Sequence, residues 1–231
     1  MNRNTTISFK ILFVTATSRE SETLNKIPGI VPVGGNYHFG KLEIVPLVTG
    51  VGAVSTAWVL KQWITVNYKP DLAINLGIAG SYKDEFKIGD VLMPYSDCFA
   101  DAGIEDGEIF FTLSEAGLRN GDEFPYKNDI LYADARYKEK MGNIMKPVKA
   151  ITVNTATGSE STRRKLMGKF NPDIETMEGA TFFYICSKEN IPFLALRAIS
   201  NKVEQRNKNN WNINLALNNL SEKLIEVLLT L

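Results

Sequence analysis

Histidine and cysteine are scarce in this chain, which has one histidine and two cysteines among 231 residues. The single histidine, His38, cannot build a multi-histidine metal site, and no serine nucleophile motif accompanies it as a catalytic triad requires. Cys98 and Cys186 lie in largely apolar sequence, without the paired spacing of a zinc knuckle or a disulfide framework. We therefore expect no metal, no cofactor and a reduced, cytoplasmic setting.

Net charge and long apolar runs are also missing. Lysine plus arginine equal aspartate plus glutamate at 26 each, so the chain has no net field to hold a polyanion or an anionic membrane surface. No stretch approaches the ~18 apolar residues that span a bilayer, and the N-terminus has no signal-type apolar region. These absences argue against nucleic acid and membranes as partners.

Short apolar runs rich in β-branched and aromatic residues recur along the chain and predict buried strands. The predicted strands are residues 7–14, 44–48, 72–76, 90–93, 150–153 and 193–199. Helical periodicity predicts helices at residues 53–66, 178–188 and 212–229. The alternation of strands and helices indicates a single α/β domain over residues 1–231, with a largely parallel sheet.

Residues 99–146 depart from this alternation. The segment is rich in Asp, Glu, Gly and Lys, with aromatic residues interspersed. We interpret it as an irregular insertion within the same domain that serves as a lid or a subunit contact, with a disordered surface loop as the alternative.

Polar side chains occur where predicted strands end. Glu20 follows the first strand, Glu178 opens a helix beside Met177, and Asn201 lies just beyond the last predicted strand. A right-handed crossover places Glu178 and Asn201 at one rim of the sheet, where open α/β sheets bind small molecules. Simpler interpretations exist: Glu20 complements a helix dipole, and Glu178 is a capping acid. We expect Glu175 to be solvated.

Two glycine-bearing turns each follow a predicted strand. They read Thr49-Gly-Val-Gly52 and Asn75-Leu-Gly-Ile-Ala-Gly80, and their glycines let backbone amides approach a bound group closely. Neither is a dinucleotide fingerprint, and no phosphate-binding loop appears. Gly80 is a candidate for lining a ribosyl pocket, although ordinary tight turns explain both segments equally well.

Together these segments resemble the nucleoside phosphorylase and nucleosidase superfamily along almost the whole chain. The matching segments, in the family's order, are the first strand with Glu20, both glycine turns, Gly89-Asp-Val, Thr176-Met-Glu-Gly-Ala180 and Arg197-Ala-Ile-Ser-Asn201. The resemblance implies a three-layer αβα sandwich with a mixed, largely parallel sheet, and a homodimer. The arginine that holds phosphate in the central turn of the phosphorylases is absent. The resemblance therefore favours the hydrolase branch, in which water cleaves the N-glycosidic bond of a purine nucleoside.

The resemblance also implies roles for individual residues. Glu20 is expected to position and deprotonate the water. Glu178 is expected to hold the ribose hydroxyls while Met177 packs against the sugar, which stabilises an oxocarbenium-like transition state. Thr155 and Thr157 fall where relatives surround the base.

Asn201 departs from the relatives that release adenine, which carry an aspartic acid at this position. Its NH₂ group can donate to a 6-oxo group or to N7, whereas an acid is better suited to a 6-amino group. Asn201 is therefore the second catalytic candidate, and hypoxanthine is the favoured base.

The segment from Ser200 to residue 213 looks most like that of the futalosine hydrolases, which act in an alternative route to menaquinone. Their substrate has an aromatic carboxylate at its 5′ end, for which Lys202, Arg206 and Trp211 are the candidate contacts. A solvated basic loop anchored by Trp211 is the other interpretation.

Three other functions remain open. The first is hydrolysis of methylthioadenosine or S-adenosylhomocysteine, the second is phosphorolysis of a purine nucleoside, and the third is nucleoside binding without turnover. The released base separates the first from futalosine hydrolysis, and a requirement for phosphate identifies the second. The presence of both Glu20 and Glu178 argues against the third.

Overall fold

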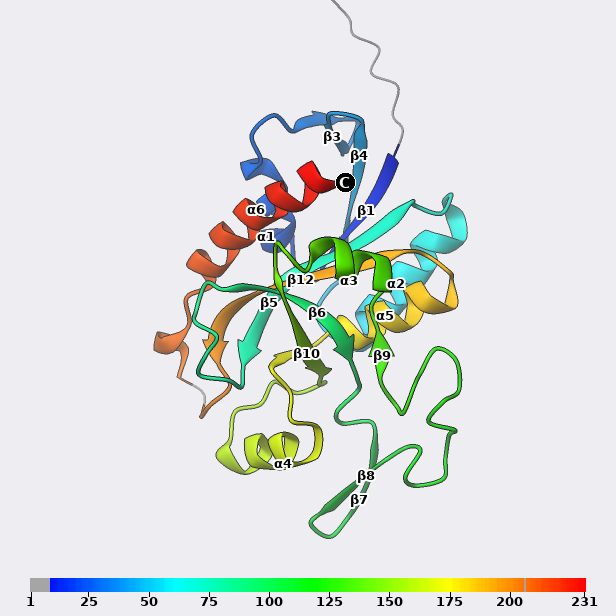
Figure 1. Ribbon diagram of the computed structural model, residues 1–231, viewed down its shortest axis with the longest axis vertical. Coiled ribbons are helices and arrows are strands. Elements are labelled where there is room, and N and C mark those ends of the chain that lie inside the picture. Colours follow the sequence, from blue (N-terminus) through cyan, green and yellow to red (C-terminus); the bar gives the residue numbers. More distant parts are fainter. Residues whose placement is uncertain (1–8, 206) are drawn as a thin grey trace, which may run out of the picture.

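A central β-sheet runs through the molecule, and helices cover both of its faces (Figure 1). The computed structural model describes residues 9–205 and 207–231. The strands are β1 (Phe9–Thr15), β2 (Val31–Val33), β3 (Asn36–Phe39), β4 (Leu42–Val48), β5 (Leu72–Ser81), β6 (Val91–Asp97), β7 (Gly103–Asp106), β8 (Ile109–Thr112), β9 (Leu131–Tyr132), β10 (Lys146–Thr152), β11 (Ile174–Thr176) and β12 (Phe193–Lys202). The helices are α1 (Ser18–Ser21), α2 (Ala53–Val66), α3 (Ala135–Met141), α4 (Glu160–Phe170), α5 (Gly179–Lys188) and α6 (Ile213–Thr230), with 3-10 helices η1 (Glu22–Lys26) and η2 (Lys208–Asn210).

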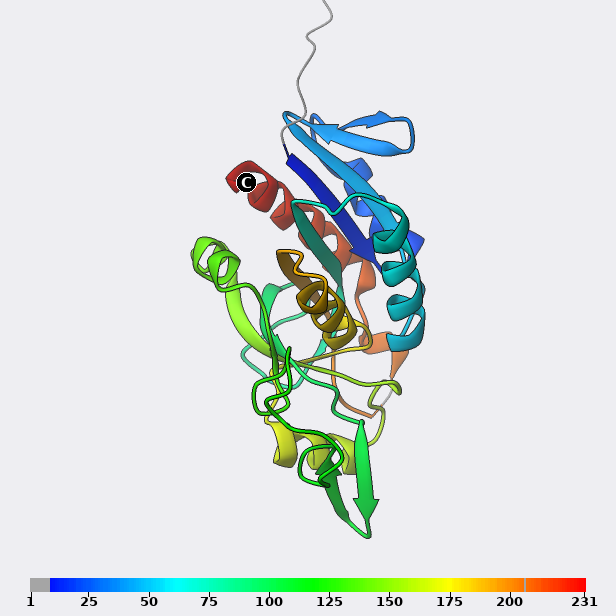
Figure 2. The same ribbon diagram turned by 90° about the vertical axis from the view of Figure 1, so that its right-hand side faces the viewer.

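Alternate side chains of the sheet face two helical layers. Ile11 and Phe13 of β1 belong to the core cluster that contains the buried residues of α6. Leu12 and Val14 belong to the cluster that contains those of α2 and α5. Because successive side chains of a strand point to opposite faces, one strand contributes to both cores. The layers are visible in Figure 1 and, from the side, in Figure 2, and they confirm the expected αβα sandwich with a mixed sheet.

Five strands at one end of the sheet close into a ring. The strand order is β11-β10-β6-β12-β5-β1-β4-β3-β2, and β11 pairs a second time with β5. Strand β5 belongs to both parts of the sheet, because residues 72–75 pair with β1 whereas Gly80 and Ser81 pair with β11. The last residues of β5 therefore lie between β12 and β11.

The predicted elements agree with the structure over most of their length. Helix α2 has its predicted bounds, and α5 and α6 each begin one residue later than predicted. Strand β5 continues five residues beyond its predicted end at residue 76. The segment 99–146 is more regular than expected, because it contains the β7–β8 hairpin, strand β9 and helix α3.

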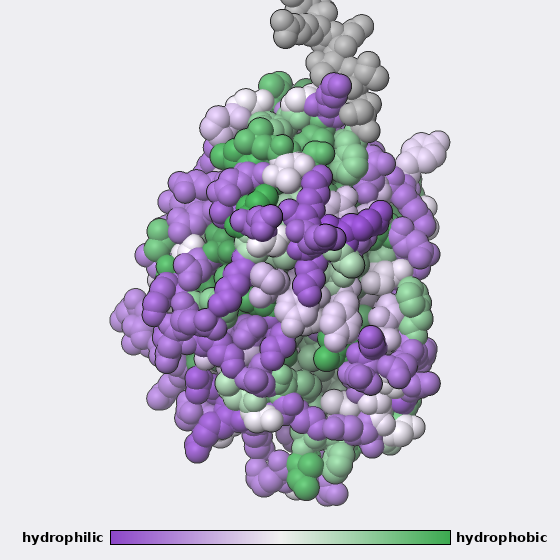
Figure 3. Space-filling view, viewed as in Figure 1, coloured by the Kyte–Doolittle hydropathy of each residue, from purple (hydrophilic) through white to green (hydrophobic). Residues whose placement is uncertain are grey.

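The surface seen in Figure 3 is mostly hydrophilic. An apolar group lies at its lower end, over the β7–β8 hairpin, where Ile104 and Ile109 are exposed. Within residues 9–205 and 207–231, no helix is both long and apolar enough to cross a membrane.

Candidate active site

A cavity of about 200 Å³ lies where the ends of β5, β11 and β12 meet the loops after β1, β4 and β10. Such a rim is the usual ligand site of α/β sheets. Of the residues predicted to form the site, those that line this cavity are Glu20, Gly80, Thr157, Met177, Glu178, Asn201 and Trp211. Thr155 is exposed and lines a neighbouring cavity between the β7–β8 hairpin and α4. Arg206 lies outside the described residues.

Glu20 is held in a capping box at the start of α1. Its Oε2 atom accepts hydrogen bonds from Thr17 N at 2.9 Å and Thr17 Oγ1 at 2.8 Å, and its own N–H donates to Thr17 Oγ1. The sequence Thr-x-x-Glu is typical of this cap. The other carboxylate oxygen, Oε1, accepts from Ile78 N at 3.2 Å. Glu20 is thus both a helix-capping residue and a buried acid of the cavity.

Strand β5 passes Glu20 so closely that a side chain at residue 77 would displace the Glu20 carboxylate. A Cβ atom on Gly77 would lie 2.9 Å from Glu20 Oε1. The glycine at position 77 therefore lets the Glu20 carboxylate lie against β5.

Glu178 is the N-cap residue of α5, but its side chain makes no capping bond to that helix. Its Oε1 atom accepts from Gly52 N at 2.8 Å. Gly52 has a φ of 92°, which favours glycine, so the first glycine turn also serves an acid of the site. The pKa of Glu178 is raised above its ordinary value, mainly by burial and also by the nearby Glu20. The Gly52 hydrogen bond and the Arg197 charge offset part of this increase.

A buried guanidinium accompanies these acids. Arg197 is 2% exposed and donates to Asn75 O at 3.0 Å, to Leu196 O at 2.9 Å and to Asn75 Oδ1. Burial lowers the pKa of Arg197, whereas the charges of Glu178, Glu20 and Asp97 raise it. Its positive charge offsets part of the repulsion between the buried carboxylates.

Asn201 lies within β12 rather than just beyond it, because the strand continues three residues past its predicted end at residue 199. The register with β5 shifts between Ile199 and Asn201, which makes Ser200 the extra residue of a β-bulge. Ser200 Oγ donates to Asn201 Oδ1 at 2.8 Å, and Asn201 Nδ2 donates to Lys202 O at 2.8 Å. Because an amide nitrogen has two N–H bonds, one more is available to a ligand.

Glu175 is buried and lines the cavity, so the expectation that it is solvated was wrong. Its Oε1 atom accepts from Thr157 N at 2.8 Å, and its Oε2 atom accepts from Thr157 Oγ1 at 2.6 Å and Tyr82 Oη at 2.7 Å. These bonds tie the loop after β10 to β11. Glu175 sits in a three-residue strand, which is too short to be identified from periodicity.

A further buried carboxylate, Asp97, was not identified from the sequence. It is 1% exposed, and its Oδ1 atom accepts from Thr152 Oγ1 at 3.0 Å, while Oδ2 has no hydrogen-bond partner among the described residues. A Cβ atom on Gly179 would lie 2.2 Å from Oδ2, so the glycine after Glu178 leaves room for this acid. Burial raises the pKa of Asp97 to about 7.

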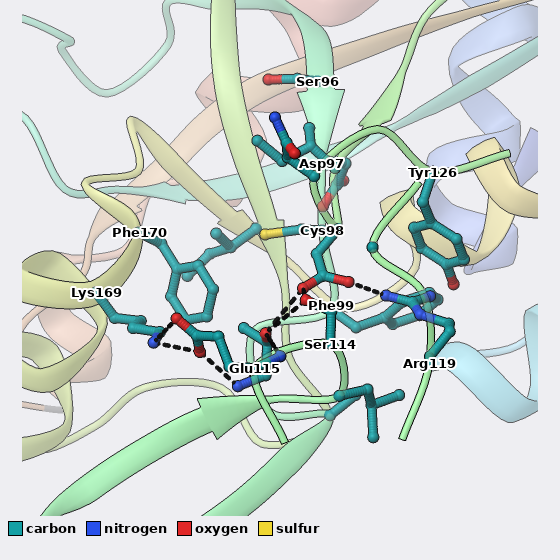
Figure 4. Close-up of a pocket in the computed structure, with 18 of the residues that line it drawn as sticks. Ser96, Asp97, Cys98, Phe99, Ser114, Glu115, Arg119, Tyr126, Lys169 and Phe170 are labelled. Atoms are coloured by element: carbon teal, nitrogen blue, oxygen red, sulfur yellow. Dashed lines mark hydrogen bonds and ion pairs between the residues drawn. The ribbon is translucent and has the colours of Figure 1, made fainter. Parts of the chain in front are cut away.

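Asp97 also contributes to the wall of a second cavity, of about 560 Å³. Figure 4 shows Lys169 and Glu115 paired on one side of that cavity and Arg119 beside Tyr126 on the other. The acids and the amide of the smaller cavity do not line it. The smaller cavity is therefore the candidate active site.

The chemistry of this site is hydrogen bonding by carboxylates, one amide and backbone N–H groups. Among the residues that the structure describes, no group of three or more His, Cys, Asp or Glu side chains is arranged to hold a metal ion. The carboxylates of Glu20 and Glu178 can bind hydroxyls or a water and stabilise positive charge, and the Asn201 amide can bind a heterocycle.

Comparison with known proteins gives a family for the chain. Residues 10–231 match the family model described as the phosphorylase superfamily. The chain is 26% identical over 205 residues to the 5′-methylthioadenosine/S-adenosylhomocysteine nucleosidase of Buchnera aphidicola subsp. Schizaphis graminum, which covers 83% of this chain and 80% of that protein. It is 30% identical over 182 residues to the futalosine hydrolase of Streptomyces coelicolor, which covers 76% of this chain and 74% of that protein.

Solved structures share the fold. The native futalosine hydrolase of Helicobacter pylori superposes with a TM-score of 0.78 at 17% identity, over 96% of this chain and 98% of that one. At this level of identity the likeness shows the arrangement of the elements, which agrees with the sandwich described above.

Proposed function

The chain belongs to the phosphorylase superfamily, and we propose that it hydrolyses the N-glycosidic bond of futalosine to release hypoxanthine and dehypoxanthine futalosine, a step of menaquinone biosynthesis. Like its relatives it is a purine nucleosidase, that is, an N-glycosyl hydrolase. The observation that carries the choice of substrate is the amide of Asn201.

The bonds around Asn201 favour a 6-oxopurine base. The Ser200 hydroxyl donates to Asn201 Oδ1, and the Lys202 carbonyl, which can only accept, accepts from the NH₂ group. The amide is thereby oriented to donate its second N–H to the ligand. A 6-oxopurine has acceptors at both O6 and N7, whereas the 6-amino group of adenine is a donor. Hypoxanthine therefore suits this site better than adenine.

The two carboxylates carry the hydrolysis in this proposal. Glu20 holds the attacking water and takes its proton, a role that contributes about 10²–10⁴ in rate. Glu178 accepts hydrogen bonds from the ribose hydroxyls while Met177 packs on the sugar. As the bond to the base breaks, positive charge develops on the ribosyl ring, and the nearby carboxylates stabilise that charge more than they stabilise the ground state.

The proposal includes a homodimer formed through an apolar face on α2 and α5. This face consists of Ala53, Val54, Ala57 and Trp58 of α2, Tyr184 and Ile185 of α5, and Phe99 and Tyr126 of the segment 99–146. Val54 is 81% exposed and Trp58 is 69% exposed, which is unusual for a face that a monomer leaves in water. Val51 lies two residues before Ala53 of this face, is exposed and lines the active-site cavity. A partner on this face would therefore reach the edge of the cavity.

The proposal also treats the chain as one cytoplasmic domain. Strand β1 and helix α6, from opposite ends of the described chain, contribute to one core cluster. Cys98 and Cys186 are both free and buried, which suits a reducing compartment.

The test is to incubate the purified protein with futalosine and, separately, with methylthioadenosine in phosphate-free buffer, and to follow free purines by chromatography. We expect hypoxanthine from futalosine, and a loss of about 10²–10⁴-fold in its rate of release in Glu20→Gln. Adenine release alone would make the protein a methylthioadenosine nucleosidase. Turnover only after phosphate is added would make it a phosphorylase, and binding without turnover would make it a nucleoside-binding protein.

A further inference from the structure

An acid and an amide flank Gly80 at the end of β5. Gly80 is in register with Asn201 on β12 and with Glu175 on β11, and all three residues line the active-site cavity. Adjacent strands lie about 4.8 Å apart, so the backbones of β11 and β12 are roughly 10 Å apart across Gly80. A Cβ atom on Gly80 would lie 3.2 Å from Asn201 Nδ2. The glycine therefore keeps open the space beside the amide.

The other end of the cavity has a different chemistry. Glu20 contacts β5 at Gly77 and Ile78, and Gly77 precedes Gly80 by three residues, or roughly 10 Å along a strand. In the proposed function, the sugar lies at Glu20 and Glu178, and the base lies at the opposite end of the cavity, beside Gly80; these are called the sugar end and the base end.

The Glu175 carboxylate has room for one more hydrogen bond. Oε2 already accepts from Thr157 Oγ1 and Tyr82 Oη, but Oε1 accepts only from Thr157 N among the described residues. Each carboxylate oxygen has two acceptor positions, so Oε1 can accept a second donor. The three existing bonds hold the carboxylate in place, which removes most of the entropy cost of binding a ligand there.

We propose that Glu175 is the specificity-determining residue for the base, and that it accepts the N1–H of a 6-oxopurine while Asn201 donates to O6 or N7. The proposal rests on the proposed function and deepens it by naming the residue that distinguishes a 6-oxopurine from a 6-aminopurine at N1. In hypoxanthine, N1 carries a hydrogen and O6 accepts. In adenine, N1 is an acceptor and the 6-position carries a donor, so N1 would face a carboxylate oxygen and the amino group would face the Asn201 NH₂.

A purely structural role for Glu175 makes a different prediction. If the carboxylate only holds the loop at Thr157, its loss would weaken the binding of both bases by the same factor. A role in reading N1–H changes the ratio between them, because only hypoxanthine has the donor that Glu175 needs.

The experiment measures the dissociation constants of hypoxanthine and adenine for the full-length protein and for Glu175→Gln by calorimetry. We expect Glu175→Gln to bind hypoxanthine about 10- to 100-fold more weakly, as loss of a hydrogen bond to a charged group implies, with adenine binding unchanged or tighter. The matched control is Tyr82→Phe, which removes one donor from the carboxylate but leaves the acceptor, and it should keep the ratio of the two constants. An equal loss for both bases in Glu175→Gln would overturn the proposal.

A ligand series tests the same contact without any substitution. For the unmodified protein, 1-methylhypoxanthine lacks the N1–H and should bind at least about 10-fold more weakly than hypoxanthine; equal affinity would overturn the role of Glu175. Hypoxanthine release from futalosine together with an unchanged base ratio in Glu175→Gln would overturn this role alone. Absence of any purine release by the unmodified protein would overturn the proposed function and this role with it.

Discussion

Replacing Gly77 with alanine should slow hydrolysis by displacing Glu20. The added Cβ atom would lie 2.9 Å from Glu20 Oε1, 3.7 Å from its Cδ and 3.8 Å from Arg197 Nε, and real Cβ atoms essentially never approach closer than 3.0 Å. Gly77 pairs with Arg197 in the ladder between β5 and β12, so the backbone has little freedom to retreat. The carboxylate must move instead.

The size of the effect follows from the bond that this movement weakens. Oε2 is anchored by Thr17 at 2.8 and 2.9 Å, whereas Oε1 has the longer bond to Ile78 N, at 3.2 Å. A hydrogen bond to a charged group contributes about 1.5–3 kcal/mol, and each 1.4 kcal/mol corresponds to about a factor of ten in rate. We therefore expect kcat to fall about 10- to 100-fold. The crowding itself should also lower the stability by about 1–3 kcal/mol.

The assay is kcat with saturating futalosine, together with the melting temperature of each variant. Gly168→Ala is the matched control, because it is the same substitution in α4, at a site with no atom within 4 Å of the added Cβ. This control should keep kcat and gain about 0.5–1 kcal/mol of stability, since alanine is the better helix former. A Gly77→Ala protein with unchanged kcat, alongside a Glu20→Gln protein that has lost activity, would refute the idea that this contact positions the acid.

Three further predictions follow from the site and its surroundings. Asn201→Asp should shift the ratio of kcat/KM values about 10-fold or more toward methylthioadenosine over futalosine, because a carboxylate accepts from a 6-amino group; an unchanged ratio would contradict the role of the amide. The pKa of Asp97 in the folded protein, about 7, lies above the ordinary value of ~3.9, so the unmodified protein should lose stability as the pH rises between these values. Residue 97 has no such titration in Asp97→Asn, so the free energy of unfolding of this variant, minus that of the unmodified protein, should increase by about 2–3 kcal/mol from pH 5 to pH 8 in urea unfolding. A difference that does not change with pH would argue against the raised pKa. Trp58→Glu should elute as a monomer in gel filtration, whereas Tyr68→Glu, 92% exposed and outside the apolar face, should elute as a dimer; identical elution of the two would count against the proposed interface.

The six strands and three helices that were predicted from the sequence have local patterns, whereas α4, β2 and β3 were not predicted. The β-branched runs and the helical period extend over enough residues to determine the type of each element, and the bounds of α2 were predicted to the residue. Strand β11 has three residues, and its second pairing joins Glu175 to Gly80. A contact between positions so far apart in the chain leaves no periodic signal, so the burial of Glu175 could not be predicted.

The candidate site was predictable in its composition but not in its geometry. Glu20, Glu178 and Asn201 were identified from residue type and position after strands, and all three line one cavity. The bulge that orients Asn201 depends on its pairing with β5. Asp97 and Arg197 are charged residues, which are mostly exposed in proteins, so their burial follows only from the packing around them.

The ring of strands restricts the backbone at the Gly80 end of the cavity, where the proposal above places the base. Gly80, Glu175 and Asn201 all belong to strands whose neighbours are hydrogen-bonded to them, so the backbone at this end has little conformational entropy left to lose when a base binds. The backbone there moves little to relieve a poor fit, so we expect a poor fit to appear as lost affinity. The loops after β1, β4 and β12 complete the other walls. Tolerance for variation in a ligand should therefore increase from its base toward its 5′ substituent.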